Sequence, residues 1–515
     1  MLAKCFSAAL VGVDAVPVEI EVFSTSGVNS FAIVGLPDQA VKESKDRIPS
    51  ALKVSGFRPN SEFSITVNLA PASVRKEGPI YDLPIAVCLL KAIGKIHNEH
   101  LDEIAMVGEL SLSGAVRPVR GVLPIAMEMK RIGKRAMIVP IANADEASVV
   151  EGIDIIPVRT LIEAVGYLNG ELDIEPYYME MDSLSSSVGS GEYDFENIKG
   201  QKIAKRAIEI AVAGGHNILM IGSPGAGKTL LARSIPSILP PMTTEEALEV
   251  TKIHSIAGVA KGGGKFVTER PFRAPHHTVS NIGLLGGGAH PLPGEVSLAH
   301  RGVLFLDEFA EFSRSALEVL RQPLEDGHVT VSRAAAACDY PSRFMLVAAM
   351  NPCPCGHFND DNHQCRCTPN QVARYQARVS GPVLDRIDIH VGLSAVSVKD
   401  LNSREKAESS AAVRERVLAA RAIQSMRYSE VKGAKTNADI KGSMLREACR
   451  ISEKCAKEME GIIERMNLSA RSYDRILRVA RTIADLKAQS DVKSDDIKEA
   501  AMYRELDRNE NSFWM

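Results

Sequence analysis

Hydrophobic and polar positions along the first third of the chain follow two different periods. Residues 16–23 and 136–140 have the alternation or the short apolar run that is typical of strands. Residues 39–55 and 83–95 have helical spacing instead, and Asp, Pro and Gly residues separate the segments. The pattern predicts a compact domain of strands and helices over residues 1–170.

The pattern changes after this first domain. Residues 171–196 include the stretch SLSSSVGSG at 183–191, which has the composition of a flexible linker. Residues 197–395 then carry short apolar runs, such as 302–306, between helical segments, which is typical of a doubly wound, mainly parallel sheet. Residues 396–515 contain helix after helix, rich in Glu, Lys, Arg and Ala. We therefore predict a multidomain α/β protein: an α+β domain, a linker, an α/β core and an all-helical C-terminal domain.

Length and charge narrow the class of protein. The 515 residues agree with about three domains at roughly 100–200 residues each. Since 61 Lys and Arg stand against 64 Asp and Glu, the net charge of −3 excludes a surface that is basic throughout, and any contact with nucleic acid must be local. No apolar run approaches the roughly 18–20 residues of a membrane span, and the apolar residues 5–13 lack a signal-peptide cleavage site. We expect a soluble, cytoplasmic protein with no membrane contact.

A glycine-rich loop follows the strand-like residues 217–221 and precedes a helical segment. Backbone N–H groups in a GxxxxGK[ST] loop surround phosphates, and the helix N-terminus adds favourable potential. Lys228 is expected to reach the β- and γ-phosphates of ATP, and Thr229 to bind Mg²⁺ through its hydroxyl. The eight residues of this predicted nucleotide-binding loop are Gly222, Ser223, Pro224, Gly225, Ala226, Gly227, Lys228 and Thr229.

An acidic pair ends the apolar run at 303–306. Asp307 is predicted to hold Mg²⁺, and Glu308 to orient and deprotonate the attacking water. The apolar run at 344–350 ends in Asn351, whose amide is suited to position the γ-phosphate; a turn residue before a proline is the alternative. An acidic pair after a strand is weak by itself, but the upstream phosphate loop makes it a strong signal for ATP hydrolysis.

Cysteines form one dense cluster. Nine cysteines in a long chain without an export signal argue against a disulfide framework. Four of them can close a tetrahedral Zn²⁺ site with a structural role. The alternatives are a redox pair, free thiols, or a zinc site in which His357 or His363 replaces one thiolate. His276 and His277 are candidates for a second metal site, but solvent-facing, interface or DNA-contacting positions are the preferred interpretation, and we assign no catalysis to them. The predicted zinc ligands are Cys353, Cys355, Cys365 and Cys367.

The order of these motifs resembles the AAA+ ATPases, which combine a P-loop, an acidic pair, a strand ending in Asn and a helical lid. The resemblance implies that Asn351 is the residue called sensor 1. It also implies that Arg386, in the sequence LDRID, is an arginine finger acting on the ATP of a neighbouring subunit, and that Arg471 is sensor 2 of the lid. A guanidinium suits both tasks because it stays charged and binds phosphate oxygens bidentately. A surface salt bridge is the plain alternative for either arginine.

The long, Gly- and His-rich interval between the P-loop and the acidic pair resembles the helix-2 insert of magnesium chelatases and MCM helicases. Residues 327–333 resemble the pre-sensor-1 hairpin of the same branch, which implies that Arg333 faces a central pore and contacts DNA. A few such cations per subunit suffice to follow a nucleic-acid backbone. An ordinary hairpin salt bridge is the alternative for Arg333.

The N-terminal domain resembles the proteolytic domain of Lon, through residues 77–80 (EGPI) and 108–114 (GELSLSG). Lon proteases use a Ser nucleophile and a Lys base. The matching positions here are Ile80 and Leu123, and neither side chain can do that chemistry. The resemblance therefore implies the fold without the peptidase.

The whole arrangement resembles the ComM/YifB family of magnesium-chelatase-like proteins. The resemblance implies a homohexameric, ATP- and Mg²⁺-dependent ring that moves along single-stranded or branched DNA, as a helicase that promotes branch migration during recombination and natural transformation. The alternatives are a chelatase-type motor subunit, an ATPase that remodels proteins, and a nucleotide-gated scaffold without motor activity. Glu308, Asn351 and Arg386 together favour hydrolysis over the scaffold.

Overall fold

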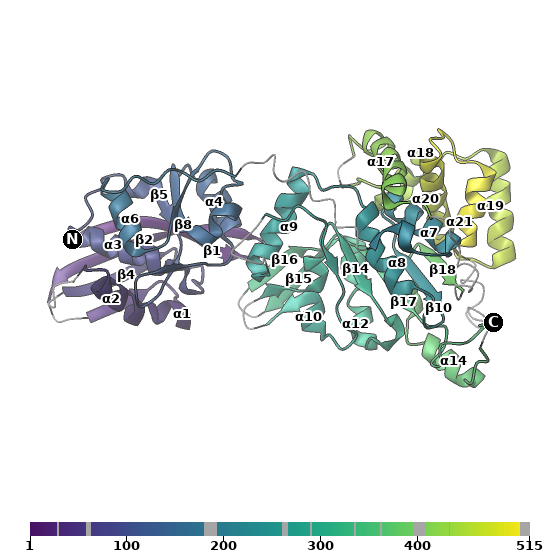
Figure 1. The fold of residues 1–515 in the computed structure, drawn as a ribbon, viewed down its shortest axis with the longest axis horizontal. Coiled ribbons are helices and arrows are strands. Elements are labelled where there is room, and N and C mark those ends of the chain that lie inside the picture. Colours follow the sequence, from purple (N-terminus) through teal and green to yellow (C-terminus); the bar gives the residue numbers. More distant parts are fainter. Residues whose placement is uncertain are drawn as a thin grey trace.

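The chain forms an elongated molecule in which an N-terminal lobe and a larger C-terminal lobe lie end to end (Figure 1). The predicted linker residues 183–191 lie outside the described part of the chain. The computed structural model describes residues 1–27, 30–57, 63–179, 193–259, 266–288, 291–333, 336–360, 363–394, 407–431 and 433–504.

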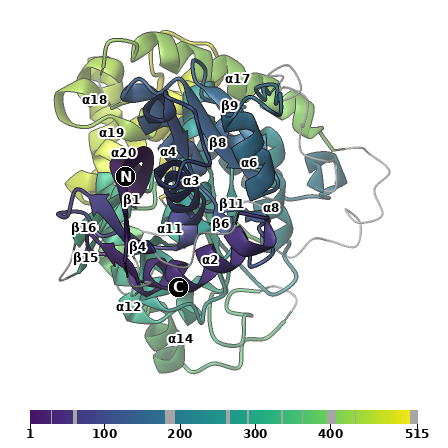
Figure 2. The ribbon, with the colours of Figure 1, turned by 90° about the vertical axis from the view of Figure 1, so that its left-hand side faces the viewer.

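A seven-stranded mixed sheet with the order β3-β4-β2-β1-β5-β8-β9 forms the N-terminal lobe. Its strands are β1 (Leu2–Val11), β2 (Asp14–Ser26), β3 (Ser30–Val34), β4 (Phe63–Ala70), β5 (Ile104–Met106), β8 (Ala136–Pro140) and β9 (Asp154–Val158). The helices seen around it in Figure 2 include α2 (Ser44–Val54), α3 (Asp82–Ala92), α4 (Val122–Arg131) and α6 (Leu161–Leu168). All of α3 except Lys91 is buried, which explains its nearly continuous apolar sequence.

Five parallel strands in the order β11-β14-β17-β10-β18 form the core of the C-terminal lobe. They are β10 (Ile218–Gly222), β11 (Phe272–Arg273), β14 (Val303–Leu306), β17 (Met345–Met350) and β18 (Ile389–Leu393). Alternate residues of β10 enter two different apolar clusters: Ile218 and Met220 face one, Leu219 and Ile221 the other. Because both faces are covered, these strands are continuous apolar runs rather than alternating ones.

The C-terminal helices pack against one side of this sheet. They are α17 (Ser410–Arg427), α18 (Gly442–Ala448), α19 (Glu453–Met466), α20 (Ala470–Leu486) and α21 (Ser494–Met502). Helices α17 and α20 contact α7 (Lys202–Gly214). A buried polar network ties them to the sheet: His216 bonds Asp388 through Nδ1 at 3.2 Å and Thr482 of α20 through Nε2 at 2.8 Å. No helix of the described residues is long and apolar enough to cross a membrane.

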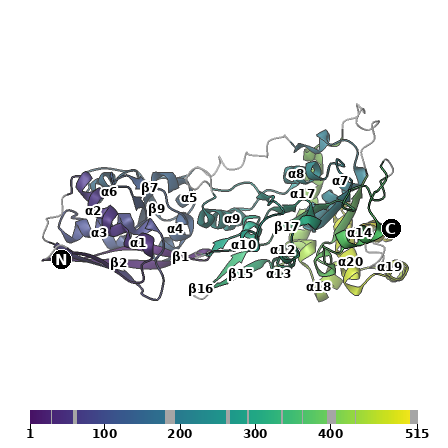
Figure 3. The same ribbon diagram turned by 90° about the horizontal axis from the view of Figure 1, so that it is seen from below.

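An insert and a hairpin extend the core towards the N-terminal lobe (Figure 3). The insert contains α10 (Asn281–Leu285) and the ribbon of β12 (Gly286–Gly287) and β13 (Leu292–Pro293). The hairpin pairs β15 (His328–Arg333) with β16 (Ala336–Pro341). Its tip carries Arg333, paired with Ala336 in the backbone register, whereas the Arg333 side chain lies outside what the structure describes.

The two lobes meet through α4 and α9 (Thr244–Ala257). The backbone N–H of Gly121, at the start of α4, donates to Oγ of Ser255 on α9 at 3.0 Å. Glu146 lies under this contact, 1 % exposed, accepting a hydrogen bond from the N–H of Val122 at 3.1 Å and bonding Ser255 as well. Burial raises the pKa of Glu146 to about 8, since the carboxylate loses its hydration there.

Candidate active site

The phosphate-binding loop connects β10 to helix α8 (Lys228–Ser234). Gly225 and Gly227 have φ angles of 80° and 91°, which non-glycine residues rarely adopt, and this lets the backbone curl. Nζ of Lys228 donates to the carbonyls of Gly222 at 2.7 Å and Ser223 at 3.0 Å, and to Oδ1 of Asn351 at 3.0 Å. Burial lowers the pKa of Lys228, while the charge of Asp307 opposes this shift. The loop thus holds its cation over the space that phosphates occupy in such sites.

A hydroxyl and a carboxylate meet beside the lysine. Oγ1 of Thr229 donates to Oδ2 of Asp307 at 2.7 Å, although 78 residues separate them in sequence. Asp307 directly follows β14, and Thr229 is the second residue of α8. Hydroxyl and carboxylate oxygens are ligands that Mg²⁺ accepts together with phosphate oxygens and water. These residues therefore fit the expected Mg²⁺.

The carboxyl ends of three neighbouring strands bring the predicted groups together. Leu306 pairs with Ala348, and Ile221 pairs with Met350, so β14, β17 and β10 end at the same edge. Asn351 follows β17 and reaches the P-loop lysine. The structure thus places Lys228, Thr229, Asp307 and Asn351 in one connected cluster at this edge.

Glu308 has a partner that sequence reasoning did not assign to the site. Oε2 of Glu308 lies 3.0 Å from Nδ1 of His277. Glu308 itself is in the left-handed region, with φ 52°. His277 comes four residues after β11. This strand runs parallel to β14, and Phe272 pairs with Val303. A prediction that residues 272–273 form a strand beside the acidic pair would have placed this histidine at the site.

The two arginines assigned by resemblance lie at the other edge of the sheet. Arg386 comes just before β18, and Asn217 before β10 donates from its side chain to the Arg386 carbonyl at 2.9 Å. The Arg386 guanidinium contacts Glu325 and the carbonyl of Pro382. Arg471 is exposed and donates to Asp385 at 3.1 Å. Both arginines are thus near the amino ends of β10 and β18, away from the P-loop of their own chain.

The remaining arginines of α20 serve packing and ion pairs, as their helical spacing indicates. Arg475 lies 3.6 Å from Asp385 and 3.8 Å from Asp388, and Arg481 is buried 3.0 Å from Asp485. Arg478 donates to the carbonyl of Ala438 at 3.1 Å. The Arg475 contacts fix α20 to the segment before β18, whereas those of Arg478 and Arg481 lie within the C-terminal helical region.

The four clustered cysteines converge on a common point. Their Sγ atoms all lie within 4.8 Å of one another, and those of Cys353, Cys355 and Cys365 are 3.3, 3.6 and 3.7 Å apart. Four sulfurs at about 2.3 Å from Zn²⁺ in a tetrahedron would be about 3.8 Å apart, so this spacing fits the metal. Burial raises the pKa of Cys353 to about 12. Burial also acts to raise the pKa of Cys355, but hydrogen bonds from backbone N–H groups outweigh it and lower this pKa to about 6.

The neighbouring histidines point to a different partner. Nδ1 of His357 is 2.9 Å from Asp360 and Nδ1 of His363 is 3.4 Å from the same carboxylate oxygen. Because the thiolates form a complete set of four by themselves, the structure favours a Cys₄ site over one in which a histidine replaces a thiolate.

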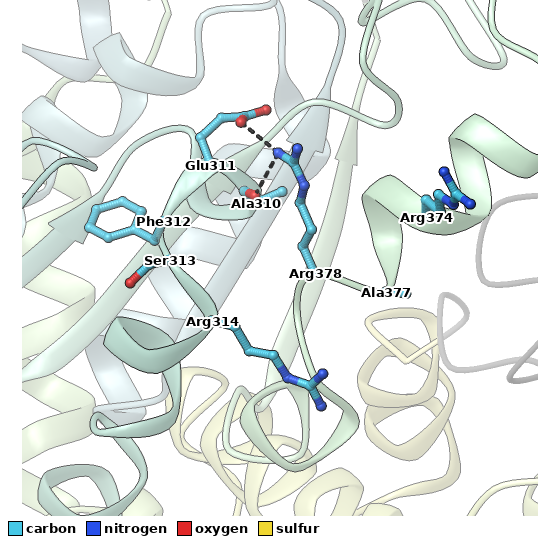
Figure 4. A pocket seen from close by; sticks show the side chains of 8 residues that line it. All are labelled: Ala310, Glu311, Phe312, Ser313, Arg314, Arg374, Ala377 and Arg378. Carbon is cyan, nitrogen blue, oxygen red and sulfur yellow. Dashed lines mark hydrogen bonds and ion pairs between the residues drawn. The ribbon is translucent and has the colours of Figure 1, made fainter.

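A pocket of about 490 Å³ opens beside the loop that follows the acidic pair (Figure 4). It is lined by three arginines, of which Arg378 reaches Glu311 at 2.6 Å and the carbonyl of Ala310 at 3.4 Å. Arg314 and Arg374 point away from this carboxylate. One Glu beside three Arg leaves the pocket positively charged and suited to anions.

The two positions predicted to correspond to the Lon dyad are apolar and buried. Ile80 lies in a short 3₁₀ turn (Pro79–Tyr81), and Leu123 in the first turn of α4. The nearby Asp82 is buried and bound by Arg47, with Nε 2.8 Å from Oδ2, and by Ser44. This polar group has its partners within the fold and orders α2 against α3.

At the level of class, the core is that of a P-loop ATPase of the AAA+ type, in which strand ends carry the nucleotide site. Comparison with known families agrees. The chain matches "Magnesium chelatase, subunit ChlI" over residues 194–401, "Subunit ChlI of Mg-chelatase" over 19–143, and "Magnesium chelatase, subunit ChlI C-terminal" over 407–504.

Whole-chain relatives narrow the class to one family. The chain is 42% identical over 510 residues to the competence protein ComM of Haemophilus influenzae, covering 98% of both chains. It is also 42% identical over 501 residues to YifB of Escherichia coli, covering 97% of this chain and 96% of YifB. The chain belongs to the ComM/YifB family of magnesium-chelatase-like AAA+ ATPases.

A third relative matches only part of the chain. Lon protease 2 of Bacillus subtilis is 26% identical over 185 residues, covering 33% of each chain. Part of the chain is thus similar to a Lon protease, and the assignment of this similarity to the N-terminal domain stays a prediction.

Proposed function

We propose that the protein is an ATP-driven motor that forms a ring of identical subunits and moves single-stranded or branched DNA in the cytoplasm. The reaction would serve branch migration in recombination, including the integration of transforming DNA. Similarity over the whole chain to a competence protein supports this role. The observation that carries the proposal is the division of the catalytic groups between two edges of one sheet.

The P-loop edge supplies what hydrolysis needs from one subunit. Lys228 and the loop N–H groups bind the phosphates, and Thr229 with Asp307 holds Mg²⁺, which neutralises phosphate charge when bound. Glu308 takes the proton of the water that attacks the γ-phosphorus, and the bond from that phosphorus to the bridging oxygen of ADP breaks. Asn351, held on Lys228, positions the γ-phosphate.

The opposite edge supplies what a neighbour needs. Arg386 lies near the amino end of β18, whereas Gly222 of the P-loop pairs with Leu393 at its carboxyl end. At about 3.3 Å per residue the strand separates them by roughly 15 Å, so Arg386 serves the nucleotide of an adjacent subunit. Arg471 lies beside it on Asp385 and acts at the same interface as sensor 2 of a helical lid. Head-to-tail contacts of this kind close into a ring, and we expect six subunits.

DNA contact is assigned to a few local cations. The β15–β16 hairpin projects from the core and carries Arg333 at its tip. The pocket with Arg314, Arg374 and Arg378 offers a second positive surface. The net charge of −3 does not prevent such binding. The affinity for DNA depends on the cations that contact phosphates, because each of these contacts releases a counterion.

The remaining features have structural roles in this proposal. The N-terminal lobe is a Lon-like domain without peptidase activity, since Ile80 and Leu123 occupy the dyad positions. The Cys₄ cluster binds a structural Zn²⁺ that braces residues 353–367.

A chelatase-type motor subunit is the second candidate function. The 67 kDa magnesium-chelatase subunit of Chlorobaculum parvum is 29% identical over 164 residues, covering 31% of this chain and 23% of that subunit. Such a protein, like an ATPase that remodels proteins, would share the hydrolysis site and differ in what stimulates it.

Steady-state ATP hydrolysis separates these functions. The purified full-length protein is titrated with single-stranded DNA and with a branched junction, and Lys228→Ala serves as the blank. We expect a strong increase in rate with DNA, followed by ATP-dependent strand exchange on the junction. A rate indifferent to both DNAs would remove the DNA motor and move tetrapyrrole or protein substrates ahead of it.

A further inference from the structure

A short turn beside the cysteine cluster brings three further metal-ligating side chains together. The N–H of Asp360 donates to the carbonyl of His357 at 3.3 Å, and Asn359 between them has φ 56°. Asparagine adopts this left-handed conformation more readily than most residues. The turn therefore places His357 and Asp360 side by side, and His363 meets them from further along the chain.

The two imidazoles share one oxygen of the carboxylate. Nδ1 of His357 lies 2.9 Å and Nδ1 of His363 lies 3.4 Å from the same Oδ2 of Asp360. The two ring centroids are 4.7 Å apart, and one ligand atom from each of the three residues lies within 4.8 Å of the others. Two ligands that are each about 2.1 Å from a tetrahedral Zn²⁺ are about 3.4 Å apart. An ion therefore fits among these atoms once the shorter contact opens slightly.

Burial distinguishes this group from an ordinary surface ion pair. The Asp360 side chain is only 6 % exposed, whereas that of His363 is 65 % exposed. A carboxylate that is removed from water requires partners, and imidazole nitrogen with carboxylate oxygen is a ligand set that Zn²⁺, Co²⁺ and Ni²⁺ accept. The exposed side of the group provides an entry path for an ion and a fourth position for water.

The cysteine cluster holds both ends of the segment that carries these residues. Cys355 comes two residues before His357, Cys365 comes two residues after His363, and the two Sγ atoms are 3.6 Å apart. Closing a chain segment into a loop costs conformational entropy. Because the cysteines already close this loop, an ion bound by the histidines and the aspartate needs to order little more than side chains.

We propose that His357, Asp360 and His363 form a second metal site, separate from the four cysteines, which binds a divalent transition-metal ion such as Zn²⁺ with water in the fourth position. Three protein ligands, one of them largely exposed, make this ion exchangeable, whereas four thiolates retain theirs during purification. The turn at Gly356, next to His357, packs on Pro224 of the P-loop, so the second ion lies beside the nucleotide loop. The site requires neither ATP nor DNA and is independent of the proposed motor.

The chain provides a matched control in the N-terminal lobe. Nδ1 of His100 lies 3.1 Å from Oε1 of Glu103, and both side chains are exposed. This pair offers one imidazole and an exposed carboxylate, whereas the proposed site offers two imidazoles on a buried one. His100→Ala removes a histidine that contacts a carboxylate and leaves the proposed site intact.

The test uses Co²⁺ as the probe, because cobalt bound to thiolates has an intense charge-transfer band in the near ultraviolet that cobalt bound to imidazole and carboxylate lacks. The full-length protein is freed of loosely bound metal by gel filtration and dialysed against increasing Co²⁺, and bound cobalt and zinc are counted by elemental analysis. We expect about one cobalt per chain to bind without the thiolate band and without loss of zinc.

Two substitutions should remove this binding. His363→Ala changes an exposed side chain, and Asp360→Asn keeps an oxygen that can accept the same hydrogen bonds, so both variants should fold. Each should lower the affinity for Co²⁺ by more than 10-fold, since even the loss of an outer-shell partner costs about 10–100-fold. His100→Ala should bind cobalt as wild type does, and the zinc content should be the same in all these proteins.

The outcomes separate the second site from the cysteine site. Equal cobalt binding by wild type and His363→Ala would show an adventitious ion only and would overturn the proposal, as would the absence of any cobalt beyond the zinc. A thiolate band with release of zinc would also overturn it, because cobalt would then occupy the cysteines. Cobalt that depends on His363 in a protein that retains no zinc would keep the second site and discard the structural Zn²⁺.

Discussion

Lys228 shows how a single side chain organises the nucleotide site. Its ammonium group donates to two P-loop carbonyls and to Asn351, so loop, cation and third strand form one unit. Burial lowers the pKa of Lys228, because the charged ammonium loses hydration in the loop. Phosphate oxygens of a bound nucleotide would replace that hydration. Glu308 takes no part in these bonds and is held by His277. Binding and proton transfer are therefore assigned to separate residues.

This separation gives two distinct phenotypes. Lys228→Ala should abolish ATP binding, because the phosphates lose their cation, whereas Glu308→Gln should bind ATP and lose about 10²–10⁴-fold in kcat, the usual contribution of a general base. Equilibrium binding of a fluorescent ATP analogue and steady-state hydrolysis measure the two quantities. Substantial turnover by Glu308→Gln would move the general base to another residue.

At the scale of elements, the turn at Gly356, between the first two and the last two clustered cysteines, packs directly on Pro224 of the P-loop. Gly356 has φ 83°, and a Cβ placed on it would lie 2.5 Å from Cδ of Pro224. The cysteine cluster thus lies behind the nucleotide loop, where a bound metal would limit the motion of both.

Metal analysis tests that role. The wild-type protein should carry about one Zn²⁺ per chain, and Cys355→Ser should lose it, lower the melting temperature and raise the KM for ATP. Cys455→Ala, at a buried thiol outside the cluster, should retain the ion. Full metal content after replacement of all four clustered cysteines would contradict the site.

At the scale of the whole molecule, the contact between the lobes buries Glu146. The pKa of this buried carboxyl is raised from its ordinary 4.5 to about 8. The folded protein therefore binds the proton more tightly than the unfolded chain does. The stability this adds is complete below about pH 4.5 and is lost as pH rises through about 8.

Substitution by the neutral amide should remove this dependence. Glu146→Gln should match the wild type near pH 5 and melt several degrees higher at pH 8.5, at roughly 2–4 °C per kcal/mol for a domain of this size. Melting curves between pH 5 and 9 measure the difference. Glu151→Gln, on an exposed side chain of the same lobe, should follow the wild type. Parallel curves for Glu146→Gln and wild type would show that this carboxyl does not titrate on folding.

Ring assembly makes a second prediction at this scale. Lys228→Ala and Arg386→Ala should each be inactive, but a mixture should regain activity, because some interfaces then join an intact P-loop to an intact finger. Random mixing restores about a quarter of the interfaces in a heterologous ring. The hydrolysis rate of equimolar mixtures, after exchange of subunits, measures this. A mixture as inactive as its components would place the finger in its own subunit or remove its role.

The sequence by itself determined the features that depend on local order. The phosphate loop needs adjacent residues between a strand and a helix, and the buried parallel strands are visible as short apolar runs at 218–221 and 303–306. The cysteine spacing likewise brings four sulfurs together through short chain connections. The family followed from the order of these motifs along the whole chain, and the relatives confirm it.

Only the tertiary structure decided what depends on the order of strands in the sheet. The position of β11 beside β14 brings His277 to Glu308, 31 residues away in sequence, and no local pattern contains that pairing. The parallel register places Arg386 at the opposite edge from the P-loop. Burial of Glu146 arises from a helix of the other lobe, because Ser255 and α9 close over it. Contacts between distant segments depend on how the elements pack. The hydrophobic period of a segment indicates only which side of that helix or strand is buried.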